Sequence, residues 1–372
     1  MRILVFSWRD PKHPLAGGAE QVMHEHMKGW VQAGHSVMLF SSRVRELDKR
    51  EVLDGIEVVR KGDQYFGVKL AGFIYYLKKK NNFDFVIDQF HGIPFFTPLY
   101  VRKPKLAVLQ EVTKEVWFLY HLMPFPFNYI LGLIGYLSEP ITLLFYKKVP
   151  FMVGSNSAKI DLIKMGIPAK NITIIPHGVI VYTPKPFPKK EKVKTIVFLG
   201  ALAKDKGVED ALKVFSILAK KGKYQFWVIG RGSPEYKDYL MSVCGKFGIT
   251  NKVIFWGFVD QKKKFELLAR AYVLINPSVR EGWGLVNIEA NSIGLPVIAY
   301  RSPGLVDSVV NGQSGILCKD NSPQEIANNV LYLLGEKALY DRLQNGSVLW
   351  SKQFSWDTSR KKSLDLIDSL AS

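Results

Sequence analysis

Residues Asn276 to Gly304, NPSVREGWGLVNIEANSIGLPVIAYRSPG, predict one compact supersecondary unit. The apolar run Tyr272 to Ile275 ends in an Asn-Pro-Ser turn and is typical of a buried strand. A glycine-rich loop, Glu281 to Gly284, leads into a helical pattern that a Gly and a Pro close. Leu295 to Tyr300 is the next expected strand. The stretch therefore predicts a strand, a loop, a helix and a second strand in succession.

The chemistry of this unit suits a sugar nucleotide. Gly284 lets the backbone approach a ligand, and the amides near Leu285 and Val286, at the start of the helix, form a natural site for a diphosphate. An ionised carboxylate only accepts hydrogen bonds, so Glu281 at the loop tip and Glu289 on the helix suit sugar and ribose hydroxyls. The alternative is that both are solvated surface charges, because Glu is common on helices.

The spacing of these two carboxylates resembles a known family. Glu281 and Glu289, with seven residues between them, lie within PSVREGWGLVNIEANSIGLPVIA, which closely resembles the E-x7-E motif of retaining family-4 glycosyltransferases. The resemblance spans nearly the whole chain and is strongest from Ile196 to Leu317. Further segments match in the expected order: Gly17-Gly18-Ala19-Glu20, LGALAKDKGVEDAL from Leu199, WVIGRGSP from Trp227 and FWGFV from Phe255. It implies a GT-B fold, in which two Rossmann-like domains face a central cleft.

The resemblance implies how the donor diphosphate is held. The family usually has an Arg and a Lys in a G-R-L-x-x-x-K-G segment, and Lys206 stands at the Lys position, where it would stabilise the leaving diphosphate. Ala201 stands at the Arg position, so a bidentate phosphate donor is missing there. Lys204 or Arg231 is the expected substitute. Retention of configuration without a metal ion is also implied, in agreement with the lack of a D-x-D motif in a suitable loop.

The resemblance assigns the remaining site residues. Gly17-Gly18 would lie near the carboxyl ends of the strands, where ligands bind in such sheets, and a simple flexible loop is the alternative. Phe258-Val259 would contact the base. Gln110 replaces a His that the family places on the donor sugar, and Gln can bond a hydroxyl but cannot become cationic. His91 is a candidate for the acceptor or sugar side, with a structural role as the alternative. The expected catalytic set is Glu281, Lys206, His91 and Gln110.

Alternating strands and helices predict an α/β fold of two doubly wound, Rossmann-like domains. The predicted N-terminal acceptor domain covers residues 1–180, and the C-terminal donor domain covers residues 195–354. Residues 181–194, rich in Pro and Lys, form the expected linker, and the resemblance implies that residues 355–372 cross back to the first domain. The expected strands of the first half are Arg2–Ser7, Ser36–Ser41, Ile56–Arg60, Phe83–Asp88, Leu106–Leu109 and Phe151–Ser155.

The composition indicates a globular, basic protein. The chain has 372 residues, of which 47% are hydrophobic, enough for two sizeable cores. Its net charge of +18 is spread over both halves and suits anionic partners, with a solvated Lys-rich surface as the alternative. No nucleic-acid-binding motif is present, so no nucleic-acid partner is expected.

Cysteine usage favours a cytoplasmic location. Cys244 and Cys318 are the only cysteines, which implies neither a disulfide framework nor a zinc site. The N-terminal MRILVFSW predicts a first strand, because no longer apolar region or cleavage site accompanies it.

The stretch Val116 to Tyr146 is the most apolar part of the chain, with one acidic residue, Glu139, and no Lys or Arg. A transmembrane span is disfavoured, because Pro124 and Pro126, with polar residues, divide it into pieces shorter than the roughly 20 residues required. A pair of buried core helices is a second interpretation. The third is a surface that lies on a membrane. Its candidate interfacial aromatics include Trp117, Phe118, Phe125, Phe127 and Tyr129, with Lys147 and Lys148 near the headgroups.

The resemblance implies a retaining glycosyltransferase that moves a hexose from a nucleotide sugar, UDP- or GDP-hexose, to a glycan or lipid-linked acceptor. Cell-surface polysaccharide or protein-glycan assembly is the expected setting, without a further cofactor. Peripheral contact with an anionic membrane at the inner face of the cell is a further expectation. The alternative is a non-catalytic GT-B protein that binds sugar nucleotides, which Ala201 and Gln110 favour.

Overall fold

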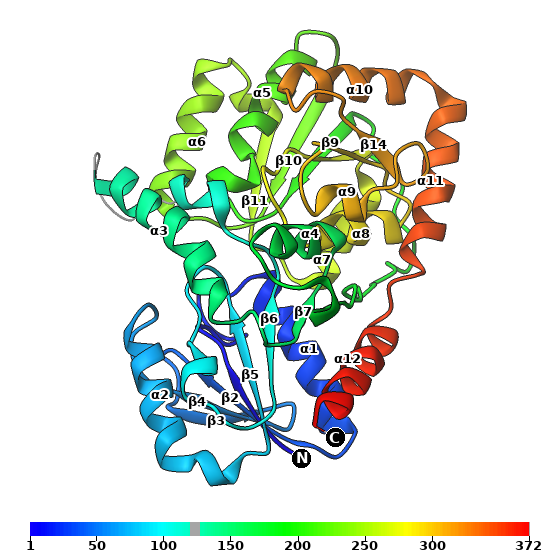
Figure 1. The fold of residues 1–372 in the computed structure, drawn as a ribbon. Coiled ribbons are helices and arrows are strands. Elements are labelled where there is room, and N and C mark those ends of the chain that lie inside the picture. The colour runs from blue at the N-terminus through cyan, green and yellow to red at the C-terminus, as the bar shows by residue number, and fades with distance from the viewer. Residues whose placement is uncertain (120–126, 372) are drawn as a thin grey trace. The chain divides into compact units, whose positions relative to one another are not determined.

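The structure, a computed structural model, describes residues 1–119 and 127–371. The chain divides into two compact units. Unit 1 comprises Met1–Gly178 and Trp356–Ser372, and unit 2 comprises Val179–Ser355. Each unit holds one sheet covered by helices on both faces (Figure 1). The prediction of two doubly wound α/β domains is therefore confirmed.

Unit 1 is built on an eight-stranded sheet in the order β3-β4-β2-β1-β5-β6-β7-β8, in which only the β3–β4 pair is antiparallel. In β1, Ile3 and Val5 enter one apolar core while Leu4 and Phe6 enter another, because successive side chains point to opposite faces. The strands are β1 Arg2–Phe6, β2 Ser36–Ser41, β3 Arg50–Leu53, β4 Ile56–Arg60, β5 Phe85–Phe90, β6 Lys105–Leu109, β7 Phe151–Val153 and β8 Ile172–Ile174.

The helices of unit 1 include one from the far end of the chain. They are α1 Gly18–Gln32, α2 Gly67–Lys79, α3 Phe127–Leu144, α4 Asn156–Lys164 and α12 Trp356–Ala371, with short 3-10 helices η1 Lys80–Asn82, η2 Thr97–Leu99, η3 Lys114–Phe118 and η4 Ala169–Asn171. Helix α12 packs on α1, where Ile367 is fully buried and the Trp30 Nε1 donates to Ser363 Oγ at 3.1 Å. An ion pair between Arg360 and Glu25 joins the same two helices. The predicted return of the C-terminal helix to the first domain is confirmed.

Unit 2 is built on a six-stranded, fully parallel sheet in the order β11-β10-β9-β12-β13-β14. Its strands are β9 Lys194–Leu199, β10 Tyr224–Ile229, β11 Val253–Gly257, β12 Val273–Asn276, β13 Val297–Ala299 and β14 Gly315–Leu317. Its helices are α5 Val208–Leu218, α6 Pro234–Lys246, α7 Gln261–Arg270, α8 Leu285–Ser292, α9 Leu305–Ser308, α10 Pro323–Gly335 and α11 Lys337–Ser351, with η5 Lys204–Lys206 and η6 Thr250–Lys252. The predicted strand, loop, helix and strand of the opening stretch are β12, its following loop, α8 and β13.

Two details of the strand prediction are wrong. The run Phe151–Ser155 was expected to be the last strand of the first half, but β8 pairs with β7 in parallel and extends the sheet by one strand. The β3–β4 hairpin was not predicted. Its turn is Asp54-Gly55, where both residues have positive φ, 48° and 82°. An Asp-Gly pair in this conformation is the strongest short hairpin signal, because the backbone twist of the turn then matches that of the strands.

Candidate functional site

The loop between β12 and α8 is fixed by a buried chain of amide side chains. Asn276 Nδ2 donates to Asn287 Oδ1 at 2.9 Å, and Asn287 Nδ2 donates to Ser308 Oγ at 2.9 Å. Asn276 Oδ1 also accepts the backbone N–H of Ser278 at 3.2 Å. All four side chains are buried. Because buried polar groups that are all hydrogen-bonded define one arrangement, the loop that carries Glu281 is held at both ends.

Helix α8 begins at a glycine that no other residue replaces easily. Gly284 has φ +80° and ψ 50°, in the left-handed region, and Leu285 and Val286 follow as the first helical residues. A Cβ added at Gly284 would lie 2.7 Å from Ser308 Oγ. The helix N-terminus is thereby placed directly after the Glu281 loop, as the sequence predicted for a diphosphate site.

Lys206 and Glu281 meet in the structure. Lys206 Nζ lies 3.1 Å from Glu281 Oε2 and 3.4 Å from Asp205 Oδ2, and each of the three side chains is between 13% and 23% exposed. Two loops bring them together, because the Asp205 carbonyl accepts the N–H of Val279 at 2.9 Å and the Ser278 hydroxyl at 3.0 Å. The β9–α5 loop and the β12–α8 loop are thus joined into one polar surface.

A second glycine allows this contact. Gly207 ends η5 with φ +71°, and a Cβ there would lie 2.1 Å from the Pro277 carbonyl oxygen. The close approach of the two loops therefore requires glycine at the position that follows Lys206.

Glu289 is paired with a residue that sequence reasoning did not select. Lys264 Nζ, from α7, lies 2.6 Å from Glu289 Oε1, and the two side chains are 13% and 14% exposed. Lys264 belongs to the Lys262–Lys264 run, which has the appearance of a solvated charge cluster in the sequence. Only the packing of α7 beside α8 shows that this lysine faces the motif carboxylate. A donor hydroxyl at Glu289 would have to share that carboxylate with Lys264.

The other predicted donor residues of unit 2 lie on loops at the ends of β9, β10 and β11. The Arg231 guanidinium lies over the Phe258 ring, 5.2 Å from its centroid, and that ring is 72% exposed. The Arg231 carbonyl accepts the N–H of Leu202 at 2.8 Å, which joins the two loops. Val259 follows Phe258 and packs against the unit 2 core, and Lys204 is exposed on η5. An exposed aromatic ring beside a guanidinium suits a planar base.

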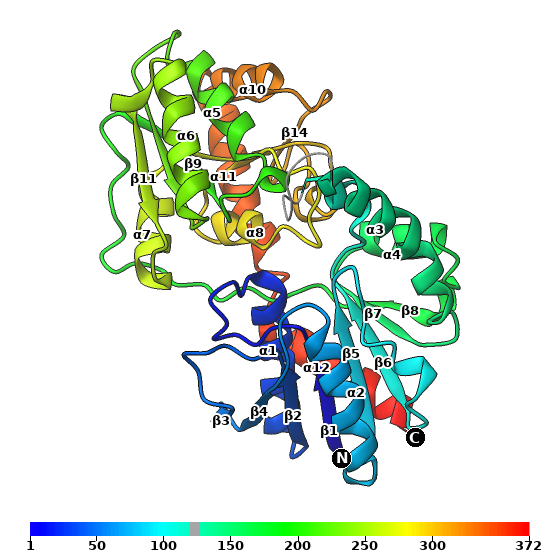
Figure 2. The ribbon, with the colours of Figure 1, turned by 90° about the vertical axis from the view of Figure 1, so that its left-hand side faces the viewer.

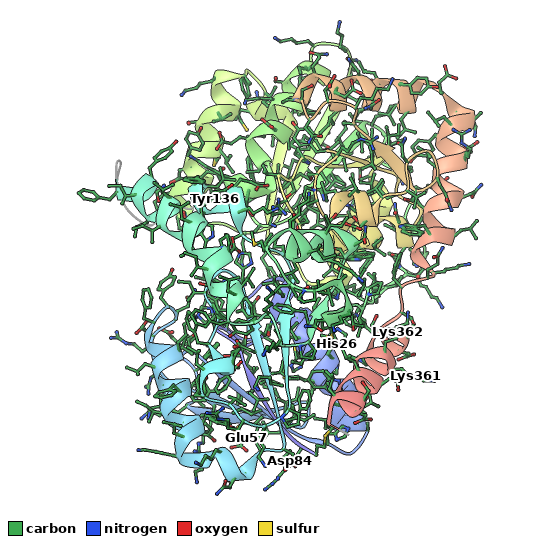
Figure 3. The ribbon with its side chains drawn as sticks, viewed as in Figure 1. His26, Glu57, Asp84, Tyr136, Lys361 and Lys362 are labelled. Atoms are coloured by element: carbon green, nitrogen blue, oxygen red, sulfur yellow. The ribbon has the colours of Figure 1, made fainter. Side chains whose placement is uncertain are left out.

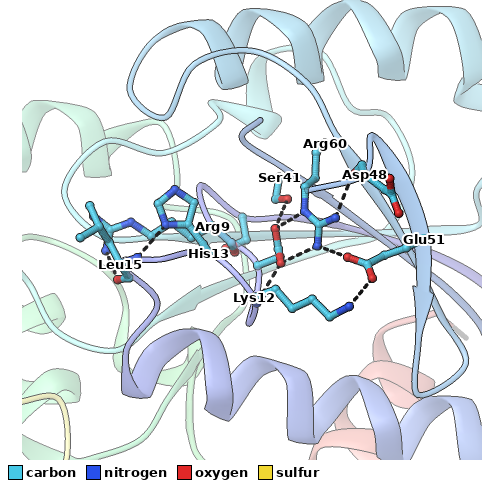
Figure 4. Close-up of polar contacts among 10 residues, drawn as sticks. Arg9, Lys12, His13, Leu15, Ser41, Asp48, Glu51 and Arg60 are labelled. Atoms are coloured by element: carbon cyan, nitrogen blue, oxygen red, sulfur yellow. Dashed lines mark hydrogen bonds and ion pairs between the residues drawn. The ribbon is translucent and has the colours of Figure 1, made fainter. Parts of the chain in front are cut away.

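The glycine loop of unit 1 follows a buried ion pair in the chain, and Figure 4 shows the contacts of Arg60, the basic partner. Asp10 accepts from Arg60 at both carboxylate oxygens, at 2.7 and 2.8 Å, and both side chains are fully buried. Burial alone would raise the pKa of Asp10, but the hydrogen bonds and charge of Arg60 hold it below its usual value. Glu51 also pairs with Arg60, 2.5 Å away. The chain then runs to Gly17, whose N–H donates to Glu20 Oε2 at 2.7 Å, and Gly18 begins α1.

Gln110 and His91 have different surroundings in unit 1. Gln110 Oε1 lies 2.6 Å from Nε2 of the buried His177, so His177 donates and is held as the Nε2–H tautomer. The site of this contact is crowded, since a Cβ at Gly154 would lie 2.3 Å from His177 Nε2. His91 stacks on Trp8, with ring centroids 6.3 Å apart. His177, which the sequence analysis did not select, thus positions Gln110.

The buried histidines predict a pH-dependent stability. Burial lowers the pKa of His177 to about 4, and burial followed by the charges of His177 and Arg360 lowers the pKa of His26 to about 3, from 6.5 in each case. His26, labelled in Figure 3, also faces Trp356 and bonds Ser363. Below pH 6.5 the unfolded chain takes up protons that the folded chain does not, so stability falls as the pH falls.

The free energy of unfolding is therefore expected to fall by about 2 kcal/mol for His177 between pH 7 and pH 5. Urea titrations at several pH values measure this slope, and His177→Gln is expected to flatten it even where that variant is less stable overall. An unchanged slope in His177→Gln would contradict the assignment.

Among residues 1–119 and 127–371, no cluster of three or more His, Cys, Asp or Glu side chains is placed to hold a metal ion. The polar groups described above instead form separate sets on each unit. In unit 2, Lys206, Glu281, Glu289, Arg231 and Phe258 lie on loops or helices that follow the carboxyl ends of strands, where parallel sheets bind ligands.

Comparison with known proteins identifies the family. Glycosyltransferase Family 4 matches residues 16–181, and Glycosyl transferases group 1 matches residues 183–348. An uncharacterized glycosyltransferase of Methanocaldococcus jannaschii is 29% identical over 175 residues, which are 46% of this chain and 44% of that protein. The chain spans about half the length of the curated relatives it matches.

Two solved structures share the fold over nearly the full length. Sucrose-phosphate synthase from Thermosynechococcus elongatus has a TM-score of 0.82 at 16% identity and covers 99% of this chain and 98% of its own. Anabaena HepE in complex with UDP-glucose has a TM-score of 0.74 at 16% identity, covering 99% and 100%. These likenesses confirm the predicted GT-B fold. The chain belongs to the glycosyltransferases, with family 4 matching its first half and group 1 its second.

Proposed function

We propose that this protein is a retaining glycosyltransferase that moves a hexose from a nucleotide sugar to a glycan or lipid-linked acceptor. The observation that carries the proposal is the contact of Lys206 with Glu281, 3.1 Å apart, directly before the N-terminus of α8. The cation and the helix N-terminus suit the diphosphate of a nucleotide sugar, and the carboxylate suits the hydroxyls of its sugar. HepE, whose structure contains UDP-glucose, supports UDP-hexose as the first donor to test, with GDP-hexose as the second.

The geometry suggests a role for each group. In the structure the Lys206 charge is balanced by Glu281 and Asp205. A bound diphosphate would compete for that ammonium group, which then stabilises the negative charge of the departing nucleotide together with the α8 amides. Glu281 is thereby released to accept hydroxyls of the transferred sugar. Retention requires that the acceptor hydroxyl arrives on the face that the nucleotide leaves. No step of this scheme calls for a metal ion.

A binding panel tests this proposal. Titration calorimetry with UDP-, GDP- and ADP-hexoses should find one nucleotide bound in preference, and slow hydrolysis of that donor without acceptor should be detectable. Absence of binding to every donor would overturn the proposal. Binding without transfer or hydrolysis would favour the second candidate, a non-catalytic protein that binds sugar nucleotides. The observations that favour this candidate are Ala201 in place of the usual Arg and the engagement of Gln110 by His177.

Glu289 provides a sharper test of the donor site. We expect Glu289→Gln to weaken nucleotide binding about tenfold or more, because hydrogen bonds to a charged acceptor contribute about 1.5–3 kcal/mol. The melting temperature is expected to fall as well, because Lys264, only 13% exposed, loses its ion-pair partner, so binding is measured at a temperature where the variant is still folded. Glu266→Gln on α7, which removes a carboxylate paired with Lys263 and Arg270, is the matched control. Equal affinity in Glu289→Gln and wild type would show that Glu289 serves only as the partner of Lys264.

We also propose a cytoplasmic location with peripheral attachment to an anionic membrane at the inner face of the cell. The support is the net charge of +18 together with a lipid-linked acceptor in the proposed reaction.

A further inference from the structure

Helix α3 has its polar and apolar sides reversed relative to a helix of a soluble core. Its buried residues are Asn128, Gly132, Gly135, Glu139 and Leu143. Six aliphatic side chains, each at least half exposed, form a stripe at helical spacing on the other side: Ile130, Leu133, Ile134, Leu137, Ile141 and Leu144. An amphipathic helix normally turns such a stripe toward the core. Here the stripe faces away from unit 1.

The polar side of α3 is firmly attached, so the helix is not free to roll. Glu139 accepts the backbone N–H of Thr113 at 2.6 Å and of Lys114 at 2.9 Å, and the Trp117 Nε1–H at 3.2 Å. A Cβ added at Gly135 would lie 2.4 Å from the Trp117 ring. The carboxylate therefore binds the start of η3, and the small residues of α3 fit over an aromatic ring.

These contacts revise two sequence expectations. Trp117 and Phe118 were candidate interfacial aromatics, but they are half-buried beneath α3, where Phe118 lies near Gly132. Phe125, with Pro124 and Pro126, lies outside the described residues. The exposed aromatics of α3 include Tyr129 and Tyr136, the latter labelled in Figure 3. The apolar surface is thus carried by α3 rather than by η3.

Helix α3 is long enough and apolar enough to cross a membrane by length and composition alone, with a mean hydropathy of 1.2 and 28% of its residues buried. At 1.5 Å per residue it would extend about 27 Å, close to the roughly 30 Å of a bilayer core. Spanning would, however, break the contacts of Glu139 and expose that carboxylate to hydrocarbon. A helix that keeps these contacts lies along the surface of unit 1.

Basic residues accompany this apolar stripe. Lys147 and Lys148 are exposed immediately after α3. Helix α2 lies on the same side of unit 1, toward the left in Figure 1 and toward the viewer in Figure 2. It exposes Leu70 and Leu77, and Lys78, Lys79 and Lys80 are exposed at its end. Apolar side chains bordered by lysines complement a bilayer with anionic headgroups.

A second copy of the chain is a weaker occupant. Helix α3 carries one ionisable acid or base, Glu139, and that side chain faces inward, so its outer stripe offers no carboxylate to the lysines of another copy. Two chains of net charge +18 also repel each other at long range, whereas an anionic bilayer attracts both.

We propose that unit 1 docks on an anionic lipid bilayer through α3, which lies in the plane of the interface with its aliphatic stripe among the acyl chains. The proposal rests on the proposed function only for its consequence, that a lipid-linked acceptor is met at the same surface. Lys147 and Lys148, which follow α3, would then lie at headgroup level, so salt is expected to weaken the attachment.

Co-sedimentation with vesicles tests the docking surface. The full chain is mixed with one of two kinds of vesicle. One is phosphatidylcholine alone, and the other also contains about 30% phosphatidylglycerol, which gives it the negative surface charge of an anionic leaflet. We expect binding to the anionic vesicles, weakened by salt, and at least a tenfold loss of partitioning in Leu133→Ser/Leu137→Ser. Leu349→Ser/Tyr332→Ser, which changes two exposed residues of unit 2, is the matched control and should bind as wild type does.

Three outcomes would overturn the proposal. In the first, wild type remains in the supernatant with both kinds of vesicle. In the second, the α3 variant binds vesicles as well as wild type does. In the third, wild type is a dimer and the α3 variant a monomer, and neither binds vesicles. Thermal melting of each variant shows that the fold is kept. Nucleotide binding without vesicles distinguishes this proposal from the proposed function, because the α3 variant should bind donor as wild type does. If wild type binds vesicles but no donor, the proposed function is overturned and the docking surface is not.

Discussion

Lys206→Ala is expected to lower kcat on the order of 100-fold, as loss of an electrostatic stabiliser of a leaving group does. The contacts of Lys206 in the structure make the expected loss of kcat larger than the loss of one phosphate contact would be. Lys206 balances both Glu281 and Asp205, so its loss leaves two carboxylates beside the diphosphate site. Their repulsion of the phosphates should also weaken donor binding. Steady-state kinetics with the preferred donor, at several donor concentrations, separate the change in kcat from the change in KM.

Two further variants decide what Lys206 does. Lys204→Ala, on the same short helix η5, is the matched control and should retain most of the activity. If it is the more damaging change, Lys204 has taken the role that Ala201 leaves empty. The double variant Lys206→Ala/Glu281→Gln removes the cation and one of the repelling charges together. Recovery of kcat in this variant would mean that Lys206 only neutralises Glu281, and would contradict direct stabilisation of the diphosphate.

The pattern around Glu281 could be predicted because it is local. A buried strand, a glycine-rich loop and a capped helix follow one another within Asn276–Gly304, and each leaves its own signal. The contact of Lys206 with Glu281 could not be predicted from residue types, because hydrogen bonds between two loops distant in sequence create it. One of these bonds joins the Asp205 carbonyl to the Val279 N–H. Because every residue has a backbone carbonyl, the sequence does not single out this contact.

Charged residues were the hardest to interpret. Lys264 lies in a run of three lysines, and nothing in that run separates the lysine that faces Glu289 from its two neighbours. Gln110 was identified through the His that it replaces, whereas its partner His177 lies 67 positions away along the chain. Such pairs depend on which helix faces or strand ends pack together, and periodicity does not contain that information.

The orientation of α3 was also beyond the sequence. The stretch is apolar nearly all around, so a hydrophobic pattern alone does not show which side faces the protein. The deciding groups are small or polar: Gly132, Gly135 and Glu139, which fit η3 through steric closeness and backbone N–H donors. These contacts form only when the fold brings η3, which follows β6 in the chain, against α3.

Asp10→Ala is expected to lower the free energy of unfolding by about 3–5 kcal/mol, because removing one partner of a buried ion pair leaves the other charge uncompensated. Arg60 keeps Glu51, 2.5 Å away, and the Asp48 carbonyl, 2.9 Å away, so the lower end of this range is expected. Urea unfolding at pH 7 measures the loss. Asp84→Ala, which breaks the exposed pair with Arg2 in the same unit, is the control and should cost much less.

The pH dependence of the free energy of unfolding provides a second test of the Asp10–Arg60 ion pair. The pKa of Asp10 is held below its ordinary value of 3.8, so its contribution to stability is present above that pH and is lost as the pH falls through the folded-state pKa. The difference between Asp10→Ala and wild type should therefore narrow only at strongly acidic pH. A constant difference down to that range would mean that the aspartate contributes through packing rather than charge.

The ion pair is also expected to position the Gly17-Gly18 loop. Asp10 accepts the N–H of Lys12 at 3.0 Å and the Ser41 hydroxyl at 3.0 Å, so its carboxylate holds the chain that leads from β1 toward α1. Asp10→Asn keeps the size of the side chain but removes the charge, and should lower kcat/KM at temperatures where the variant is still folded. The apolar pair Asp10→Leu/Arg60→Met should recover part of the stability without recovering kcat/KM. Replacing both buried charges removes their desolvation cost, although the Ser41 hydroxyl and the Asp48 carbonyl lose their partners. Recovery of both would show that the buried pair serves stability alone and that the loop is positioned by other contacts.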